Sequence, residues 1–190
     1  PPAFHEQVID LALEHGVNVL CEKPIADSME ASLRIADKVG KSGLKMAVTM
    51  SHRFDQDKST FRAELKSGRN GAVDYIVCRF TSDCRIYGTW SKFRHEMKDP
   101  MILEGAVHHL DIIADFAGAK CDAIYARTWN PKWGEFNGDT QGLVCLEFEN
   151  GIKAFYEGSS VNAVGLNSWR DEYFRAECER YGFGSLLFDF

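Results

Sequence analysis

The chain has 190 residues, of which 45% are hydrophobic and 26% charged, the balance of a globular protein with a substantial core. Its net charge is −6 and its basic residues are scattered, which argues against nucleic acid or an anionic membrane as a partner. No apolar stretch approaches the roughly 20 residues of a membrane span, and the first residues do not resemble a signal peptide. The six cysteines form no C-x-x-C pair. We therefore expect a cytoplasmic protein.

The first fifty residues alternate between helix-like and strand-like patterns. The spacing of Phe4, Val8 and Leu11 predicts a helix that Gly16 ends. The apolar run 17–21 predicts a strand, a second helix begins at Asp27 or Ser28, and 45–50 predicts another strand. Asp27 and Glu30 have the spacing of a capping box. We expect residues 1–50 to be the C-terminal part of a doubly wound Rossmann domain, an α/β remnant.

The pattern changes after Met50. A helix over 59–67 precedes an alternating strand over 73–81, and further strands are predicted over 123–129, 143–149 and 152–158. Asn150-Gly151 between the last two predicts a type I′ hairpin turn. Residues 83–100 lack periodicity and predict a long loop. We expect residues 51–190 to form an α+β domain with a large, mostly antiparallel open sheet.

The segment 101–118 carries the strongest functional signal. On a continuous α-helix, Glu104, His108, Asp111 and Asp115 fall within an arc of roughly 60°, between two apolar flanks. We expect this polar stripe to face a water-filled cleft, the alternative being a solvent-exposed amphipathic helix. His108 would act as general base, with Glu104 one turn earlier to hold it. His109 points away from the stripe and is expected to be a structural histidine bonded to backbone.

Two further features bear on chemistry. His, Asp and Glu at these spacings also suit a zinc site, but the H-E-x-x-H pattern is absent, so we predict no metal. Lys23 lies between a buried strand and Pro24, at the carboxyl end of a strand where open α/β sheets bind ligands. The alternative for Lys23 is a solvated surface lysine.

Two separated motifs resemble those of one enzyme family. Glu22-Lys23-Pro24, after a helix that carries His5, resembles the E-K-P signature of the Gfo/Idh/MocA oxidoreductases. The segment 104–111 is similar to their second motif, acidic-x-x-x-His-x-x-Asp. The resemblance covers essentially the whole chain.

The resemblance implies a Rossmann domain followed by an α/β domain with an open sheet. It implies hydride transfer between NAD or NADP and a sugar, inositol or related polyol. It places Lys23 and His108 at the nicotinamide, with Glu22 and Pro24 as further cofactor-binding residues. It also implies a homodimer or homotetramer that pairs through the open sheet.

The substrate residues are expected to be Lys23 and His108 together with two more. Asp111 would hydrogen-bond substrate hydroxyls, and Arg53, after the last Rossmann strand, would line the same cleft or else lie on the surface. Three tryptophans, Trp90, Trp129 and Trp133, would stack on a sugar or be buried in the sheet.

The sequence departs from the family in two respects. Glu104 stands where the family commonly has Asp, and the Gly-rich phosphate loop G-x-G-x-x-G does not occur. We therefore expect this fragment alone to bind NAD weakly and to be inactive. Two alternatives stay open. An NAD-assisted glycosidase would release an aglycone without net change in nicotinamide absorbance. A catalytically silent binding or oligomerisation module would have an intact mass near 21.4 kDa.

Overall fold

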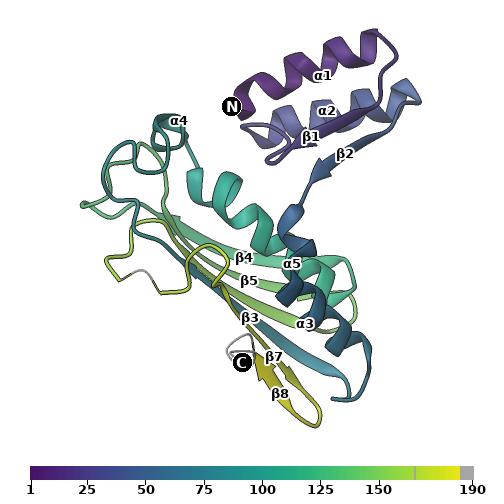
Figure 1. Cartoon of the computed structure of the whole chain (residues 1–190), viewed down its shortest axis with the longest axis vertical. Helices are drawn as coiled ribbons and strands as arrows, with labels where there is room; N and C mark the ends of the chain where they lie inside the picture. The colour runs from purple at the N-terminus through teal and green to yellow at the C-terminus, as the bar shows by residue number, and fades with distance from the viewer. Residues whose placement is uncertain (165, 185–190) are drawn as a thin grey trace. The chain divides into compact units, whose positions relative to one another are not determined.

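The computed structural model describes residues 1–164 and 166–184. They divide into two compact units, the first from Pro1 to Met50 and the second beginning at Ser51 (Figure 1). Among these residues no helix is both long and apolar enough to cross a membrane.

The first unit is a small parallel α/β layer. Its elements are η1 (Pro2–Phe4), α1 (His5–Glu14), β1 (Val19–Glu22), α2 (Met29–Ser42) and β2 (Met46–Thr49). The two strands pair in parallel, with Val19 opposite Met46. Ile9 of α1, Ile35 of α2 and Cys21 of β1 form the core with Ala26 and Ala31. The predicted Rossmann remnant is confirmed.

The helix predicted from Phe4, Val8 and Leu11 is confirmed as α1, although these three residues are exposed and Ile9 faces the strands. One local prediction in this unit needs correction. The cap of α2 is Ser28, whose hydroxyl accepts a hydrogen bond from the Ala31 backbone N–H at 3.2 Å, and not Asp27.

The second unit is built on a six-stranded sheet. Its helical elements are η2 (Ser51–Phe54), α3 (Gln56–Lys66), α4 (Lys92–Glu96), η3 (Met101–Ala106) and α5 (Val107–Ala117). Its strands are β3 (Val73–Thr81), β4 (Cys121–Trp129), β5 (Gln141–Phe148), β6 (Lys153–Ser159), β7 (Tyr173–Cys178) and β8 (Gly182–Gly184). The strand order is β4-β5-β6-β3-β7-β8, and every pairing is antiparallel except β3 with β6. The predicted α+β domain with a mostly antiparallel sheet is confirmed.

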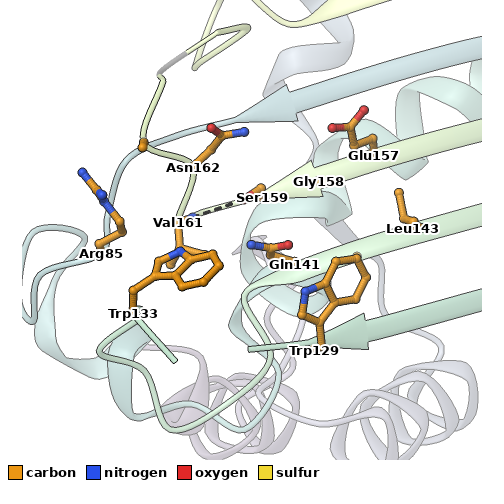
Figure 2. Close-up of a pocket in the computed structure, with 12 residues that line it drawn as sticks. Arg85, Trp129, Trp133, Gln141, Leu143, Glu157, Gly158, Ser159, Val161 and Asn162 are labelled. Carbon is orange, nitrogen blue, oxygen red and sulfur yellow. Dashed lines mark hydrogen bonds between the residues drawn. The ribbon is translucent and has the colours of Figure 1, made fainter. Parts of the chain in front are cut away.

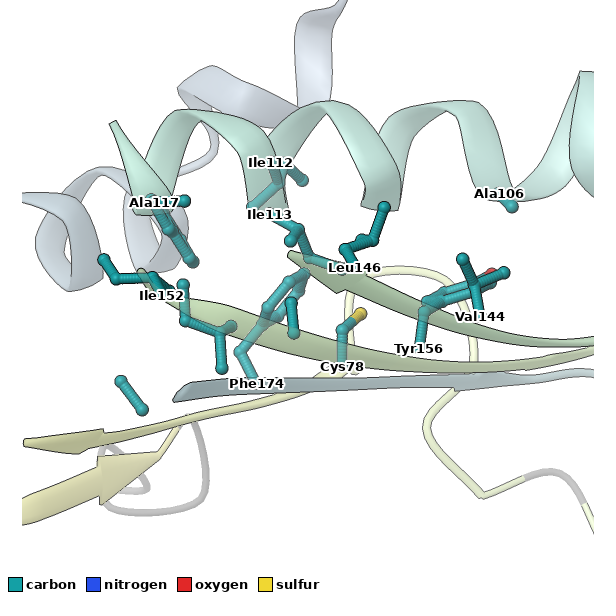
Figure 3. Close-up of a cluster of buried hydrophobic side chains, with 14 of the residues drawn as sticks. Cys78, Ala106, Ile112, Ile113, Ala117, Val144, Leu146, Ile152, Tyr156 and Phe174 are labelled. Atoms are coloured by element: carbon teal, nitrogen blue, oxygen red, sulfur yellow. The ribbon is translucent and has the colours of Figure 1, made fainter. Parts of the chain in front are cut away.

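Helices α3 and α5 cover one face of this sheet, and the core lies between (Figures 1 and 3). Strand residues alternate accordingly: Ile76, Cys78 and Phe80 of β3 are buried against Ile112 and Ile113 of α5, with the other core residues of β5, β6 and β7 beside them. On the opposite face, Leu143 and Phe155 are about half exposed. The sheet therefore has one covered and one open face.

Two loop predictions are wrong in detail. Asn150 is not among the positive-φ residues, so the β5–β6 turn is not type I′. Gly151 has φ 87° and its N–H donates to the Phe148 carbonyl at 2.8 Å, the pattern of a three-residue loop that ends on a left-handed glycine. The segment 83–100, predicted as a loop, contains α4.

Candidate active site

The chemistry-bearing segment begins as a π-helix and continues as an α-helix. Residues 101–106 form η3, and α5 then runs to Gly118, which ends it at φ 65°. The predicted continuous α-helix is therefore wrong in its first turn, because π winding adds a residue to each hydrogen-bonded ring. Glu104 lies in the π-helical part and contacts α4, whereas Asp111 and Asp115 lie in α5 and contact η2 and α3.

Glu104 is buried and bound by Arg94 from α4. Arg94 donates to Glu104 Oε1 from Nε at 2.8 Å and also from Nη2. The guanidinium lies over the rings of Phe93 and Trp90, 4.5 and 5.2 Å from their centroids. The longer Glu104 side chain, in place of the family's aspartate, thus carries its carboxylate to a fixed cation.

His108 packs into an aromatic cluster. Its ring stacks on His52 of η2, with centroids 4.3 Å apart and planes 10° apart. The Trp169 ring is nearly perpendicular to both histidine rings, with its centroid 5.2 Å from that of His52 and 6.2 Å from that of His108. Only 4% of His108 is exposed. The imidazole is therefore held by ring contacts on its own unit.

The two aspartates further along α5 are each bound by an arginine. Arg53 donates to Asp111 from Nε at 2.9 Å and from Nη2, a bidentate pair, and Arg62 donates from Nε to Asp115. The hydrogen bond to Asp111 raises the pKa of Arg53 against the opposing effect of burial. Within this unit, Asp111 and Asp115 of the stripe are therefore paired with arginines from 51–62, and Glu104 is paired with Arg94 of α4.

A buried ionic network involves His109, the residue that follows His108 in the chain. Lys58 Nζ donates to Glu172 at 2.7 Å and to Asp57 at 2.7 Å, and Glu172 Oε1 lies 3.7 Å from His109 Nε2. His109 Nδ1 lies 3.0 Å from the Tyr156 hydroxyl. His109 is fully buried, and its partners among the described residues are the side chains of Tyr156 and Glu172 and not the predicted backbone.

Burial and charge partners shift the pKa values of Glu172, Lys58 and His109. Burial alone raises the pKa of the Glu172 carboxyl, but the facing His109 and Lys58 outweigh it and hold that pKa well below its usual range. Burial lowers the pKa of Lys58, and its bonds to Asp57 and Glu172 more than reverse the effect. Burial lowers the pKa of His109, and Glu172 offsets this only in part. The network therefore consists of a charged Lys58–Glu172 pair beside a neutral imidazole.

Sequence reasoning missed several of these residues. His52 precedes α3 and Arg62 lies on it, and neither belongs to a recognisable motif. From the sequence, Lys58 resembles an ordinary solvent-exposed lysine of that helix. Glu172 falls in a polar stretch without periodicity. The available signal was charge complementarity, since two arginines, Arg53 and Arg62, precede a helix whose stripe carries two aspartates.

In the first unit, the predicted Lys23 follows the carboxyl end of β1. His5 Nδ1 lies 3.0 Å from the Pro24 carbonyl and 3.5 Å from Cys21 Sγ, so α1 fixes the loop that carries Lys23. Pro24 is buried, Glu22 is exposed and Lys23 is half-buried. The tripeptide is therefore anchored at its proline.

The tryptophans are distributed differently from the prediction. Trp90 lies against Arg94, whereas Trp129 and Trp133 line a pocket on the open face of the sheet (Figure 2). Because α5 covers the other face, these two residues do not belong to the His108 cluster.

Comparison with known proteins now decides the family. Residues 59–180 match the GFO/IDH/MocA C-terminal domain, and residues 1–50 match the oxidoreductase family with an NAD-binding Rossmann fold. The chain belongs to the GFO/IDH/MocA family. The motif resemblance is thereby confirmed.

The relatives of this GFO/IDH/MocA chain include dehydrogenases. It is 60% identical over 179 residues to the uncharacterised protein y4oX of Sinorhizobium fredii, covering 94% of this chain and 50% of that protein. It is 29% identical over 156 residues to inositol 2-dehydrogenase of Corynebacterium glutamicum, covering 80% of this chain and 44% of that enzyme. The chain thus spans about half the length of the curated relatives it matches.

Solved structures share the fold. An oxidoreductase from Agrobacterium radiobacter in complex with NAD+, L-tartaric acid and magnesium has a TM-score of 0.87 at 18% identity, covering 97% of this chain and 53% of that one. An inositol dehydrogenase homolog from Azotobacter vinelandii, complexed with NADH and myo-inositol, has a TM-score of 0.79 at 18% identity, covering 97% and 48%.

Proposed function

We propose that this chain belongs to a nicotinamide-dependent oxidoreductase that acts on a sugar, an inositol or a related polyhydroxylated molecule. The observation that carries the proposal is His108. It stands at the histidine position of the family's second motif, and this chain's relatives include inositol dehydrogenases. Its ring stacks on His52 and is perpendicular to Trp169. A fixed imidazole is what general-base catalysis on a hydroxyl requires.

The residues of the first unit fit a nicotinamide cofactor, NAD or NADP. Lys23 follows the carboxyl end of a parallel strand, where open α/β sheets bind nucleotides, and the His5–Pro24 contact fixes its loop. Glu22, Lys23 and Pro24 would hold the cofactor, with the buried Pro24 fixing the backbone of the other two. The cofactor, when bound, exchanges a hydride with a substrate carbon.

The proposed proton transfer uses residues of this chain alone. His108 takes the proton of the substrate hydroxyl as its carbon gives up the hydride, so two electrons and one hydrogen leave with the hydride and one proton stays on the imidazole. Lys23 is proposed to stabilise negative charge that develops on the same oxygen. Glu104 and Arg94 act as a positioning pair for the first turn that leads into α5.

Substrate recognition is assigned to the Arg53–Asp111 pair. In a bidentate pair, the carboxylate can still accept, and the guanidinium can still donate, further hydrogen bonds to hydroxyl groups. The Arg53 side chain is 35% exposed and the Asp111 side chain 17%. Because the pair is neutral overall, it suits an uncharged polyol better than an acid or a phosphate.

The test is a nicotinamide absorbance assay with a panel of sugars and inositols. The assay uses the full-length enzyme that contains this chain. We expect at least one of these compounds to reduce NAD or NADP there, and His108→Gln to lose that activity while substrate binding persists. Failure of every polyol to reduce either cofactor overturns the proposal, and so does full activity in His108→Gln.

We further propose a homodimer or homotetramer through the open face of the sheet. One row across that face runs Tyr125, Cys145, Phe155 and Val77 through successive strand pairings. Tyr125 is 67% and Phe155 46% exposed, an apolar band of the kind that associates.

A further inference from the structure

The segment that leads into β7 contacts the histidines of the candidate site. The Trp169 ring centroid lies 5.6 Å from that of His109, in addition to its contacts with His52 and His108. Three residues later, Glu172 Oε1 lies 3.8 Å from His52 Nδ1 and 3.7 Å from His109 Nε2. One carboxylate oxygen therefore faces two imidazoles that come from different elements, η2 and α5.

The Glu172 carboxylate is fixed at both of its oxygens. Lys58 Nζ donates to Oε2 at 2.7 Å, and the Arg170 backbone N–H donates to Oε1 at 3.0 Å. The Glu172 side chain is fully buried, and the Lys58 side chain is 2% exposed. The negative charge therefore has a fixed position relative to the histidine rings, and water screens its field only weakly.

The backbone before Glu172 has an uncommon conformation that supports this arrangement. Asn167 and Arg170 have φ angles of 60° and 71°, values that are uncommon for residues other than glycine. The Thr81 N–H donates to the Asn167 carbonyl at 3.1 Å, which ties this turn to the end of β3. Backbone of this kind is concentrated at functional sites, so the turn is expected to do more than connect two strands.

Stability alone does not account for the buried Lys58–Glu172 pair. Removing one partner of such a pair is costly, because the other charge is then buried alone. Replacing both partners by apolar side chains of similar size is often neutral or even stabilising. The charge on Glu172 therefore needs an explanation beyond the free energy of folding.

The carboxylate selects one orientation of the His52 ring. The separation of 3.8 Å is too long for a hydrogen bond, so the interaction is electrostatic. A carboxylate attracts the N–H edge of an imidazole and repels a lone pair, which favours the ring orientation and tautomer with N–H at Nδ1. The orientation of His52 in turn limits that of the His108 ring stacked on it.

We propose that Glu172 is a positioning residue for His108 and that it acts through His52. The contacts run in the order Lys58, Glu172, His52 and His108. Their effect is to keep the His108 ring in the orientation in which it accepts a proton. The inference rests on the proposed function, because it assigns Glu172 a part in the same proton transfer.

The first test measures kcat and KM of the full-length enzyme that contains this chain, with myo-inositol and NAD+. Glu172→Gln keeps the shape of the side chain and removes its charge, so we expect kcat to fall about tenfold with KM unchanged. Glu172→Asp retains the charge and should recover part of kcat. The matched control is Glu64→Gln, which removes the charge of an α3 carboxylate paired with Arg69 and should leave both constants unchanged.

A double variant separates positioning from folding. Lys58→Met combined with Glu172→Leu removes both charges, and its melting temperature should stay near that of the wild type because no charge is left buried alone. Its kcat should nevertheless fall about tenfold. In a His52→Ala background, Glu172→Gln should lower kcat no further, because the two residues act in one series of contacts.

A second readout needs no substrate. In the same enzyme with isotope-labelled histidine, the NMR signals of the ring nitrogens report the tautomer and surroundings of each imidazole. We expect Glu172→Gln to shift the ring signals of His52 and His108, and Glu64→Gln to leave them unchanged.

Three results overturn the inference. The first is wild-type kcat in the double variant. The second is an effect of Glu172→Gln on kcat that is as large in the His52→Ala background as in the wild type. The third is an unchanged set of His52 and His108 ring signals in Glu172→Gln. A wild-type enzyme that shows those signal shifts but no turnover of myo-inositol supports the positioning of His108 and counts against the proposed function instead.

Discussion

His52 and His108 stack face to face, with ring centroids 4.3 Å apart and planes 10° apart. The two rings come from different elements, η2 and α5, so the stack fixes the rotation of the His108 side chain from outside its own helix. We therefore regard His52 as a positioning residue for the proposed general base.

Removing the His52 ring tests that role. In the full-length enzyme that contains this chain, we expect His52→Ala to lower kcat about tenfold, because His108 loses one of the surfaces that fix its orientation. His52→Phe keeps a flat ring and should restore most of kcat, whereas a purely structural role would show in the melting temperature alone. Steady-state kinetics and thermal melts of both variants provide the measurement. Equal kcat in His52→Ala and wild type contradicts the assignment.

Substitutions of the two adjacent histidines should have different effects on kcat and on stability. In the full-length parent enzyme, His108→Asn is expected to lower kcat about 10²–10⁴-fold, the usual contribution of a general base. His109→Asn removes a fully buried ring that contacts Tyr156 and Glu172. It should therefore lower the melting temperature markedly while it lowers kcat much less than His108→Asn does. Because His108 is itself only 4% exposed, the decisive readout is the ratio of the kcat loss to the stability loss. The reverse pattern would show that the roles are exchanged.

The buried Lys58–Glu172 pair should dominate local stability. Lys58→Met leaves the Glu172 carboxylate buried without its ammonium partner, at an expected cost of about 3–5 kcal/mol in the free energy of unfolding. The control is Lys41→Met, which breaks an exposed helical pair with Asp37 and should cost about 0.5 kcal/mol or less. Urea denaturation of both variants measures the difference. Similar losses in the two variants would contradict this prediction.

Stability should fall as the solution is acidified through the histidine range. Burial lowers the pKa of His109, so the unfolded chain takes up its proton near pH 6.5 while the folded chain does not yet do so. The contribution of His109 is therefore fully present above about pH 6.5 and is lost below it. His109→Gln should flatten this part of the stability profile, measured by urea denaturation between about pH 7.5 and 5.5. An unchanged slope in His109→Gln would show that the other histidines account for the fall.

The open sheet face should control oligomeric state. Phe155→Glu places a charge in the middle of the apolar row and is expected to shift the protein to monomer. Leu33→Glu, at an exposed position of α2, is the matched control and should leave the mass unchanged. Light scattering at tens of micromolar decides between them; a wild-type monomer at that concentration contradicts the proposal.

The sequence by itself was sufficient for the elements with strong local patterns. The alternation of Ile76, Cys78 and Phe80 predicted β3, and the helix–strand–helix–strand order of residues 1–50 predicted the parallel layer, because period and length are local properties. The two motifs also identified the family and the candidate residues Lys23 and His108. Those predictions needed no knowledge of which residues distant in the chain come together.

Tertiary structure alone decided what the polar stripe of α5 meets. Helical periodicity places Glu104, Asp111 and Asp115 near one another but cannot say that Arg94, Arg53 and Arg62 reach them from other elements. Residues of η3 pack against β5 and β6, and no local signal distinguishes its π winding from an α-helix. The same holds for Trp129, whose placement on the open face follows from its pairing with Gln141. A one-residue shift in that register would move Trp129 to the other side of the sheet.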